Sequence, residues 1–205
     1  MVGEMIAQGA EAVLAREGDS IIKHRIAKGY RSPVLDHKIR KQRTRIEGRI
    51  LERARKVIPA PNVLSVNEHT SEIRMEYVDG EKLSDHLDEF DGRKAMRVCK
   101  LIGENAARMH DAGIIHGDLT TSNMIYSAEK VYFIDFGLGF HSIRIEDKAV
   151  DLHLLRQAFE SKHFKKWKGY FEAIIKVYKK ESVNSEKVLN QLKKVESRGR
   201  YKGKR

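Results

Sequence analysis

Two polar motifs stand at either end of a predicted β-hairpin in the middle of this 205-residue chain. Residues 116–123 read HGDLTTSN, and residues 135–137 read DFG. Between the motifs, residues 123–127 and 130–134 are rich in apolar and aromatic side chains, and a two-residue turn separates them, as in a hairpin. Because a hairpin returns the chain to where it started, we predict that both motifs meet at one site.

The part of the chain before residue 79 predicts a small sheet with one helix inserted in it. Apolar or alternating stretches bounded by Gly, Asp or Glu predict short strands at 12–16, 20–23, 63–67 and 73–78. Between the second and third strands, residues 36–57 have apolar side chains at helical spacing, and Pro59 and Pro61 end the predicted helix. One acid, Glu47, falls on the otherwise apolar stripe of that helix.

After residue 80 the pattern is typical of helices. A broad apolar stripe from Ala95 to Met109 predicts a helix that stops at Gly113 and delivers the chain to the first motif. In the C-terminal part, Phe164 and Trp167 fall on one apolar face and are expected to pack in the core. Further helices are predicted at 148–161, 164–178 and 185–195.

The net charge of +11 is unevenly distributed. Residues 23–56 hold thirteen Lys and Arg against three Asp and Glu, and residues 198–205 hold five Lys and Arg and no acid. Polyanions, either nucleic acid or an acidic protein surface, are therefore candidate partners, and a solvated charged face is the alternative.

A single cysteine, no apolar run long enough to span a bilayer and no signal-peptide pattern predict a cytoplasmic protein without a membrane segment.

The two motifs supply side chains that suit phosphoryl transfer from ATP. In that reaction the protein mainly holds metal ions against the phosphates and positions the acceptor. Asp118 can face an acceptor hydroxyl while the amide oxygen of Asn123 faces Mg²⁺. Asp135 ends a predicted strand, where it can bind the same ion, and Gly137 lets the backbone turn directly afterwards. For either carboxylate alone, a turn or helix-cap role is the alternative.

In this order and at this spacing, the motifs resemble those of protein kinases. Residues 116–123 resemble the catalytic-loop pattern H-R-D-L-x-x-x-N, and residues 135–137 match D-F-G. The resemblance implies an α+β, bilobal, protein-kinase-like fold. The β-rich N-lobe with one helix would span residues 1–78. The reduced, mostly helical C-lobe would span residues 79–197, and a basic tail would span residues 198–205.

The resemblance also implies roles for residues near the phosphates of ATP. Lys23 stands where the strand lysine of kinases contacts the phosphates, and Glu47 is its expected ion-pair partner. Gly9 and Ala10 fall in the expected phosphate-covering loop. Together with Asp118, Lys23 and Glu47 form the implied catalytic set, and Asn123 and Asp135 form the implied metal-binding set.

Other implied roles are architectural or lie at the adenine end of the site. Residues 75–78, MEYV, resemble the hinge between kinase lobes, so the Glu76 carbonyl and the Val78 amide are expected to bind the adenine edge. Asp151 lies in an apolar helix, where an unpaired carboxylate would cost several kcal/mol. The resemblance implies that Asp151 accepts backbone N–H groups around His116, a residue that is itself expected to be architectural; a solvent-facing Asp151 is the alternative.

Four departures from the kinase pattern distinguish this chain. The covering loop at residues 6–12 has a single glycine, and Glu11 within it would repel phosphate unless it pairs with a cation. Gly117 replaces an arginine that docks a phosphorylated activation segment, and Thr120 replaces a phosphate-contacting lysine. Only about a dozen residues follow Asp135 before Asp147, so there is little platform for a peptide substrate.

With these departures, the chain resembles the small PRPK-type kinases of the KEOPS complex. The similar segments are QGAEA at 8–12, KGYRSP at 28–33 and the basic C-terminus RGRYK at 198–202, so the resemblance extends over nearly the whole chain. It implies an ATPase and atypical serine/threonine kinase that works beside the threonylcarbamoyl-transferring subunit and other KEOPS subunits. The modified base is adenosine 37 of tRNA, and tRNA would be reached through the complex. The tail residues expected to contact a polyanion or partner are Arg198, Arg200, Lys202, Lys204 and Arg205.

Three alternatives remain open at this point. Aminoglycoside and choline kinases share similar loops but usually have a larger helical half. RIO-type kinases share the Gly or Ala of the loop but commonly have Asp-x-x-Gln in place of D-F-G. A scaffold that binds tRNA or protein through residues 23–56 and the tail, with a nucleotide pocket serving only as structure, is the non-enzymatic alternative.

Overall fold

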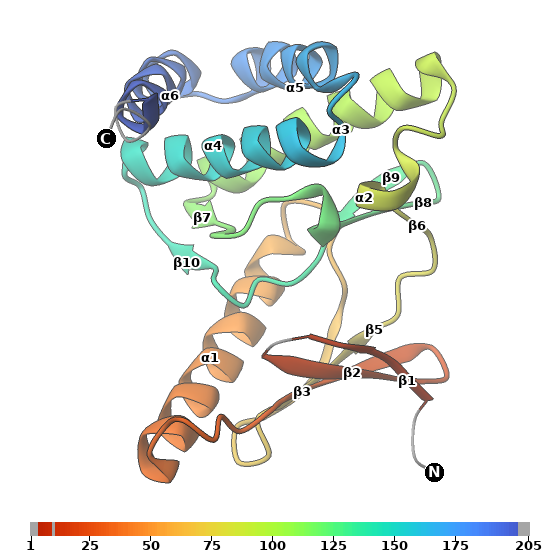
Figure 1. The fold of residues 1–205 in the computed structure, drawn as a ribbon, viewed down its shortest axis with the longest axis vertical. Coiled ribbons are helices and arrows are strands. Elements are labelled where there is room, and N and C mark those ends of the chain that lie inside the picture. The colour runs from red at the N-terminus through yellow and green to blue at the C-terminus, as the bar shows by residue number, and fades with distance from the viewer. Residues whose placement is uncertain (1–3, 10, 201–205) are drawn as a thin grey trace.

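The N-terminal part of the chain forms a five-stranded antiparallel sheet with one long helix beside it (Figure 1). The strand order is β1-β2-β3-β5-β4. These elements are β1 Glu4–Gln8, β2 Ala12–Glu17, β3 Ser20–Arg25, α1 Pro33–Ala54, β4 Val63–Asn67 and β5 Glu72–Glu76. The computed structural model describes residues 4–9 and 11–200, without the side chains of residues 199 and 200.

Helix α1 begins at a clear capping signal. The side chain of Ser32 accepts a hydrogen bond from the backbone N–H of Leu35 at 3.5 Å, and Pro33 occupies the first turn, where its missing N–H costs nothing. The buried face of α1 carries Ile50 and Leu51, and Glu47 is also buried on it. The helix therefore delivers a carboxylate into the interior next to the sheet.

The C-terminal part is mainly helical, with short strands at its border with the sheet (Figure 1). The strands form two small sheets, one in the order β6-β8-β9 and one pairing β10 with β7. The helices are α2 Leu83–His86, α3 Gly92–Asp111, α4 Ile145–Lys162, α5 Trp167–Glu181 and α6 Ser185–Arg200; the short elements are β6 Glu81–Lys82, β7 Ile114–Ile115, the 3₁₀ turn Thr121–Asn123, β8 Met124–Ser127, β9 Lys130–Phe133 and β10 Phe140–His141.

Both parts share one hydrophobic core. Ile50 and Ile73 from the sheet region belong to the same buried cluster as Ile102 of α3 and Leu152 of α4. Asp91 caps the start of helix α3, because its side chain accepts hydrogen bonds from two backbone N–H groups, and the helix ends before Gly113, which has φ +71°. A continuous core fixes the strand-borne side chains against the loops of the helical part.

The predicted α+β class is confirmed, with differences in detail. The four predicted strands and the inserted helix are present within a few residues of the expected ends, and strand β1 is additional. Trp167 packs against the core as expected, but Phe164 is 77% exposed because α5 starts only at Trp167. Within the described residues, none of the helices is long and apolar enough to cross a membrane.

Candidate active site

The central hairpin brings the two motifs together, as predicted. Strands β8 and β9 pair antiparallel with Met124 opposite Phe133, and the Ile134 N–H donates to the Asn123 carbonyl at 3.0 Å. The residue after Ile134, Asp135, has φ +60°, a conformation that costs an ordinary residue free energy and clusters at functional sites. The ends of the two strands therefore place Asn123 and Asp135 side by side.

The first motif is held by Asp151, also as predicted. Its carboxylate is fully buried and accepts the backbone N–H of His116 at 2.8 Å and that of Gly117 at 2.9 Å. The His116 Nε2 lies 3.0 Å from the Ile134 carbonyl, which ties the loop to the hairpin. Burial lowers the pKa of His116, which favours its neutral form.

A buried network behind Asp151 was missed at the sequence level. His110 Nε2 lies 3.2 Å from Asp151 Oδ2, and His110 Nδ1 lies 2.9 Å from the Tyr178 hydroxyl. On the other side of the loop, His163 Nε2 lies 3.1 Å from the hydroxyl of buried Thr121. Two buried histidines thus brace the loop from the helices, and neither histidine belongs to a recognisable motif.

Asp118 and Asn123 lie together at the open end of the loop. The Asn123 amide Nδ2 donates to both the backbone carbonyl and the Oδ2 of Asp118, each at 2.9 Å. This orientation leaves the amide oxygen of Asn123 to face a cation. Asp135 Oδ1 accepts the Gly137 N–H at 3.2 Å, so the turn after the strand also orients the second carboxylate.

Lys23 joins the sheet, α1 and the second motif. Its Nζ lies 2.7 Å from Glu47 Oε1 and 2.6 Å from Asp135 Oδ1, and both Lys23 and Glu47 are buried. Burial alone would lower the pKa of Lys23, but the carboxylates of Glu47 and Asp135 outweigh it and raise the pKa. Burial would raise the pKa of Asp135, and the neighbouring Lys23 ammonium lowers it instead. The expected Lys23–Glu47 contact is therefore present, and Lys23 also contacts Asp135.

Lys23, Asp118 and Asp135 line a cleft of about 430 Å³ beneath the β1–β2 hairpin. Its charged lining consists of the carboxylates of Glu11, Asp118 and Asp135 and the cations Lys23 and Arg25. Three acids against two bases do not by themselves favour a polyphosphate. Additional cations would reverse that balance, as in Mg²⁺-dependent phosphate sites.

The Asp135 carboxylate in the cleft fits Mg²⁺, and so does the amide oxygen of Asn123, a residue that is hydrogen-bonded to Asp118 of the cleft. Mg²⁺ prefers oxygen ligands and is usually held by one or two protein groups together with substrate phosphates. The Asp135 carboxylate and the Asn123 amide oxygen supply that pair. Among the described residues no cluster of three or more His, Cys, Asp or Glu side chains could hold a metal by itself, so substrate oxygens would complete the coordination.

The covering loop is the tip of the β1–β2 hairpin. Gly9 lines the cleft, and its N–H donates to the Ala12 carbonyl at 2.9 Å; Ala10 lies outside the described residues. Glu11 pairs with Arg43 of α1 and lies 3.6 Å from Arg25 Nη1. The expected repulsion between Glu11 and phosphate is thus offset by cations. Arg25 and Arg43 were not singled out from the sequence.

The hinge segment joins the sheet to the helical part. The Tyr77 N–H donates to the Asp19 carbonyl at 2.9 Å, which fixes the segment to the turn between β2 and β3. The Glu76 side chain is exposed and accepts the Asn62 N–H at 3.1 Å, whereas Val78 is buried. The adenine contacts of the Glu76 and Val78 backbones stay a prediction.

Gly117 has a structural reason to be glycine. Its φ is +79°, and a Cβ at this position would lie 2.3 Å from the Leu138 carbonyl oxygen. The segment after Gly137 packs directly onto the catalytic loop, and β10 then pairs with β7. The backbone of this short segment occupies the space next to residue 117.

The predicted basic tail is only partly described. Arg198 belongs to α6, and its Nη1 lies 2.7 Å from Glu146 Oε1 of α4. The backbone of Arg200 ends α6, and Lys202, Lys204 and Arg205 lie outside the described residues. Helix α6 continues to Arg200, so the first three residues of the predicted tail are helical, and the tail boundary at residue 198 stays a prediction.

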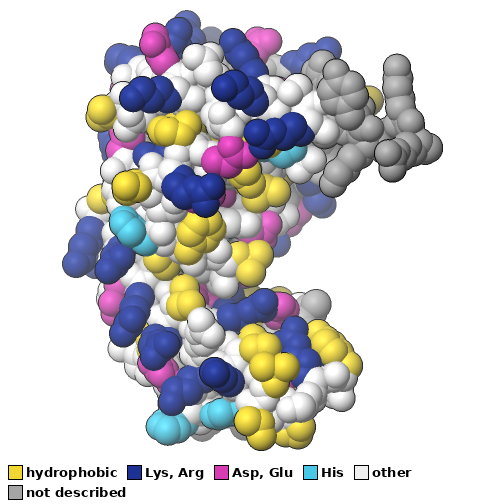
Figure 2. All heavy atoms as spheres, turned by 90° about the vertical axis from the view of Figure 1, so that its left-hand side faces the viewer, with side chains coloured by type: hydrophobic (Ala, Val, Ile, Leu, Met, Phe, Trp, Pro, Cys, Tyr) yellow, Lys and Arg dark blue, Asp and Glu magenta, His cyan; other side chains and the backbone are white. Residues whose placement is uncertain are grey.

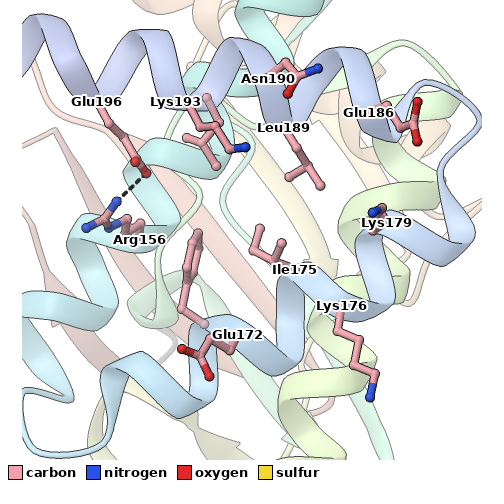
Figure 3. A pocket seen from close by; sticks show the side chains of 12 residues that line it. Arg156, Glu172, Ile175, Lys176, Lys179, Glu186, Leu189, Asn190, Lys193 and Glu196 are labelled. Atoms are coloured by element: carbon pink, nitrogen blue, oxygen red, sulfur yellow. Dashed lines mark ion pairs between the residues drawn. The ribbon is translucent and has the colours of Figure 1, made fainter.

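A second cavity, of about 680 Å³, lies between α4, α5 and α6 (Figure 3). Apolar side chains such as Ile175 and Leu189 point into it, and an Arg156–Glu196 ion pair of 2.6 Å spans one end. None of the motif residues lines this cavity, so it is not the candidate active site.

Comparison with known proteins shows the family to which this chain belongs. Residues 19–142 match the sequence model of the RIO domain, and this span includes Lys23, Glu47, Asp118, Asn123 and Asp135. The chain belongs to the RIO-domain, protein-kinase-like family. The family match includes the D-F-G triplet, so that triplet does not separate this chain from RIO-domain proteins.

Three relatives are similar to this chain over nearly its whole length. The KEOPS complex subunit Bud32 of Pyrococcus abyssi is 41% identical, with 97% of this chain and 96% of the relative covered. A probable serine/threonine-protein kinase BUD32 homolog of Archaeoglobus fulgidus is 38% identical over 94% of both chains. A probable bifunctional tRNA threonylcarbamoyladenosine biosynthesis protein of Methanococcus vannielii is 42% identical, and there the match covers 96% of this chain but 36% of the relative.

Proposed function

We propose that this chain is an atypical kinase and ATPase that transfers the γ-phosphoryl group of ATP to water or to a serine or threonine hydroxyl. The observation that carries the proposal is the convergence of Lys23, Asp118 and Asp135 on one cleft. The RIO-domain match and the kinase homologue support the same reaction class. The cleft has side chains that can bind phosphate, but the short segment after Gly137 leaves little surface beside it for binding a peptide substrate.

Each residue of the cleft would have a separate task. Lys23, held by Glu47, would bind phosphate oxygens, and Asp118 would orient the attacking hydroxyl or water and accept its proton. Asn123 and Asp135 would hold Mg²⁺, which when bound neutralises charge on the phosphates. Asp151 keeps Asp118 in place by fixing the backbone of the preceding two residues.

The proposed setting is the KEOPS complex and tRNA threonylcarbamoylation in the cytoplasm. Of the relatives similar over nearly the whole of this chain, one is named as a KEOPS complex subunit and another as a tRNA threonylcarbamoyladenosine biosynthesis protein. The partners would be the threonylcarbamoyl-transferring subunit and other KEOPS subunits, with tRNA reached through the complex. The lobe boundary at residues 78 and 79 belongs to the same proposal.

The outer face of α1 supports contact with a polyanion. The exposed side chains of Lys38, Arg45, Arg49 and Arg53 follow one another at helical spacing and form no ion pair with any described residue. Lys and Arg side chains are spread over the face drawn in Figure 2, which is the side on which α1 lies in Figure 1. A row of unpaired cations along a helix suits a phosphate backbone.

ATP turnover by the purified chain tests the proposed reaction. Asp135→Ala should reduce turnover by about a hundredfold or more, because it removes a group on which charge stabilisation depends. Asp85→Ala, in an exposed position on α2, is the control and should turn over ATP like the wild type. The variants are compared with and without the threonylcarbamoyl-transferring partner and tRNA. Undiminished hydrolysis by Asp135→Ala would rule out the assignment.

A further inference from the structure

The covering loop of this chain is attached to α1 by side-chain charges. The backbone carbonyl of Glu11 accepts the Ile26 N–H at 3.1 Å, which fixes the base of the loop to the end of β3. Its carboxylate then pairs with Arg43 of α1, although residues 11 and 43 are 32 positions apart. A loop with one glycine has few ways to place successive amides over phosphate, so its position must be set by other contacts.

Arg25 links this attachment to the catalytic lysine. Residues 23 and 25 lie on the same face of β3, and their side chains share the carboxylate of Glu47: Lys23 bonds Oε1, and Arg25 pairs with Oε2. Arg25 is 4% exposed and also lies 3.6 Å from Glu11. A continuous chain of charges therefore runs from the loop through Arg25 and Glu47 to Lys23.

The same chain reaches the second motif. Arg25 Nη2 would lie 3.1 Å from a Cβ on Gly137, so its guanidinium sits against the backbone of the D-F-G turn. Lys23 completes the link by contacting Asp135 at 2.6 Å. Loop, helix and metal-binding aspartate are thus held by one set of paired charges.

We propose that Glu11, Arg25 and Arg43 are positioning residues that fix the covering loop over the phosphates of ATP and couple its position to the Lys23–Glu47 pair. The proposal rests on the ATP-binding role assigned to the cleft. It gives Glu11 a favourable part in nucleotide binding although its charge has the same sign as phosphate. The Arg43 hydrogen bond lowers the pKa of Glu11, so this carboxylate is charged at neutral pH.

The direction in which Glu11→Gln changes the affinity for ATP distinguishes this role from simple electrostatic repulsion. If Glu11 acts only as a negative charge in the cleft, Glu11→Gln removes a repulsion and tightens ATP binding. If Glu11 holds the loop, the same change weakens binding. Exposed ion pairs contribute modestly, so we expect an increase of about three- to fivefold in the ATP dissociation constant and in KM, with kcat changed less.

Arg43→Gln should have a larger effect than Glu11→Gln. It frees the loop and also leaves the Glu11 charge without its main partner beside the phosphates, so we expect about a tenfold increase. The double variant should match Glu11→Gln alone, because the repelling charge is then gone. Such non-additivity is the signature of a pair that acts together. Glu11→Asp, which keeps the charge, should recover part of the affinity.

The measurements are binding of a fluorescent ATP analogue, steady-state ATP turnover and hydrogen exchange of peptides covering the β1–β2 turn. Glu17→Gln is the matched control, because Glu17 ends β2 and pairs with Arg74 away from the cleft. Faster exchange in Glu11→Gln and Arg43→Gln, with the control unchanged, is expected even without nucleotide.

Tighter ATP binding by Glu11→Gln, additive effects, or unchanged exchange of the turn would each overturn the proposal. A wild-type chain that binds no ATP would instead refute the proposed function, and the exchange comparison would still decide whether the ion pairs hold the loop. The two failures are therefore distinguishable.

Discussion

Replacing Gly117 by alanine tests whether the segment after the D-F-G turn packs on the catalytic loop as the structure shows. Two costs follow from the geometry. The residue has φ +79°, which costs a non-glycine residue on the order of 1 kcal/mol. The new Cβ would lie 2.3 Å from the Leu138 carbonyl oxygen, so loop and segment must separate by about 1 Å to reach an ordinary contact. Together we expect a loss of about 2–4 kcal/mol in the free energy of unfolding.

The separation should also reduce catalysis. Leu138 follows Asp135 by three residues, and a displacement of about 1 Å at a reacting group can lower a rate by up to roughly a hundredfold. Urea unfolding followed by circular dichroism measures the first effect, and ATP turnover at saturating ATP measures the second. Gly169→Ala is the control: residue 169 is exposed in α5, and a Cβ there would meet nothing within 4 Å, so stability should rise by about 0.5–1 kcal/mol. A Gly117→Ala protein as stable and active as the wild type would refute the packing argument.

Two further predictions concern the buried carboxylate of Asp151 and the carboxylate of Asp135, which pairs with Lys23. Asp151→Asn should lower the free energy of unfolding by about 3 kcal/mol. The two backbone N–H groups bond to different oxygens of the carboxylate, and in asparagine an NH₂ group would replace one of these oxygens and face a donor. Urea unfolding of the variant and the wild type measures this loss, and an unchanged midpoint would contradict it. Burial raises the pKa of Asp135, but Lys23 and the Gly137 N–H together lower it below its ordinary value. The contribution of Asp135 to stability is therefore present above the unfolded carboxyl pKa of about 3.9 and is lost as the pH falls through the lower folded value. Urea midpoints between pH 2 and 6 should therefore fall less steeply for Asp135→Asn than for wild type, and equal slopes would count against the pairing.

Features that depend on local sequence were predictable. The hairpin between the motifs, the Gly113 stop and the helix carrying Glu47 all follow from apolar periodicity and turn residues, and each is present. The Asp151 contact was predictable for a different reason, because a carboxylate on an apolar helix must find donors. In each case the signal lies within one element or in one misplaced polar group.

Pairings between distant polar residues were not predictable. Arg43 is one of many cations on α1, and nothing in its spacing distinguishes it from the exposed Arg45. His163 and Thr121 are 42 residues apart, and each is ordinary in its local context. Strand β1 was missed because residues 6–12 were interpreted as one covering loop, whereas residues 6–8 belong to the strand. Such contacts depend on the packing of several elements at once.

The departures from the kinase pattern share one physical consequence. Where longer kinases use an arginine to dock a phosphorylated segment, this chain has Gly117 with the Leu138 backbone lying against it. Its covering loop has one glycine, and its Glu11 carboxylate is held by α1. In both places the folded chain itself makes a contact that would otherwise require a phosphate group. The cleft should therefore bind ATP without prior phosphorylation of the chain.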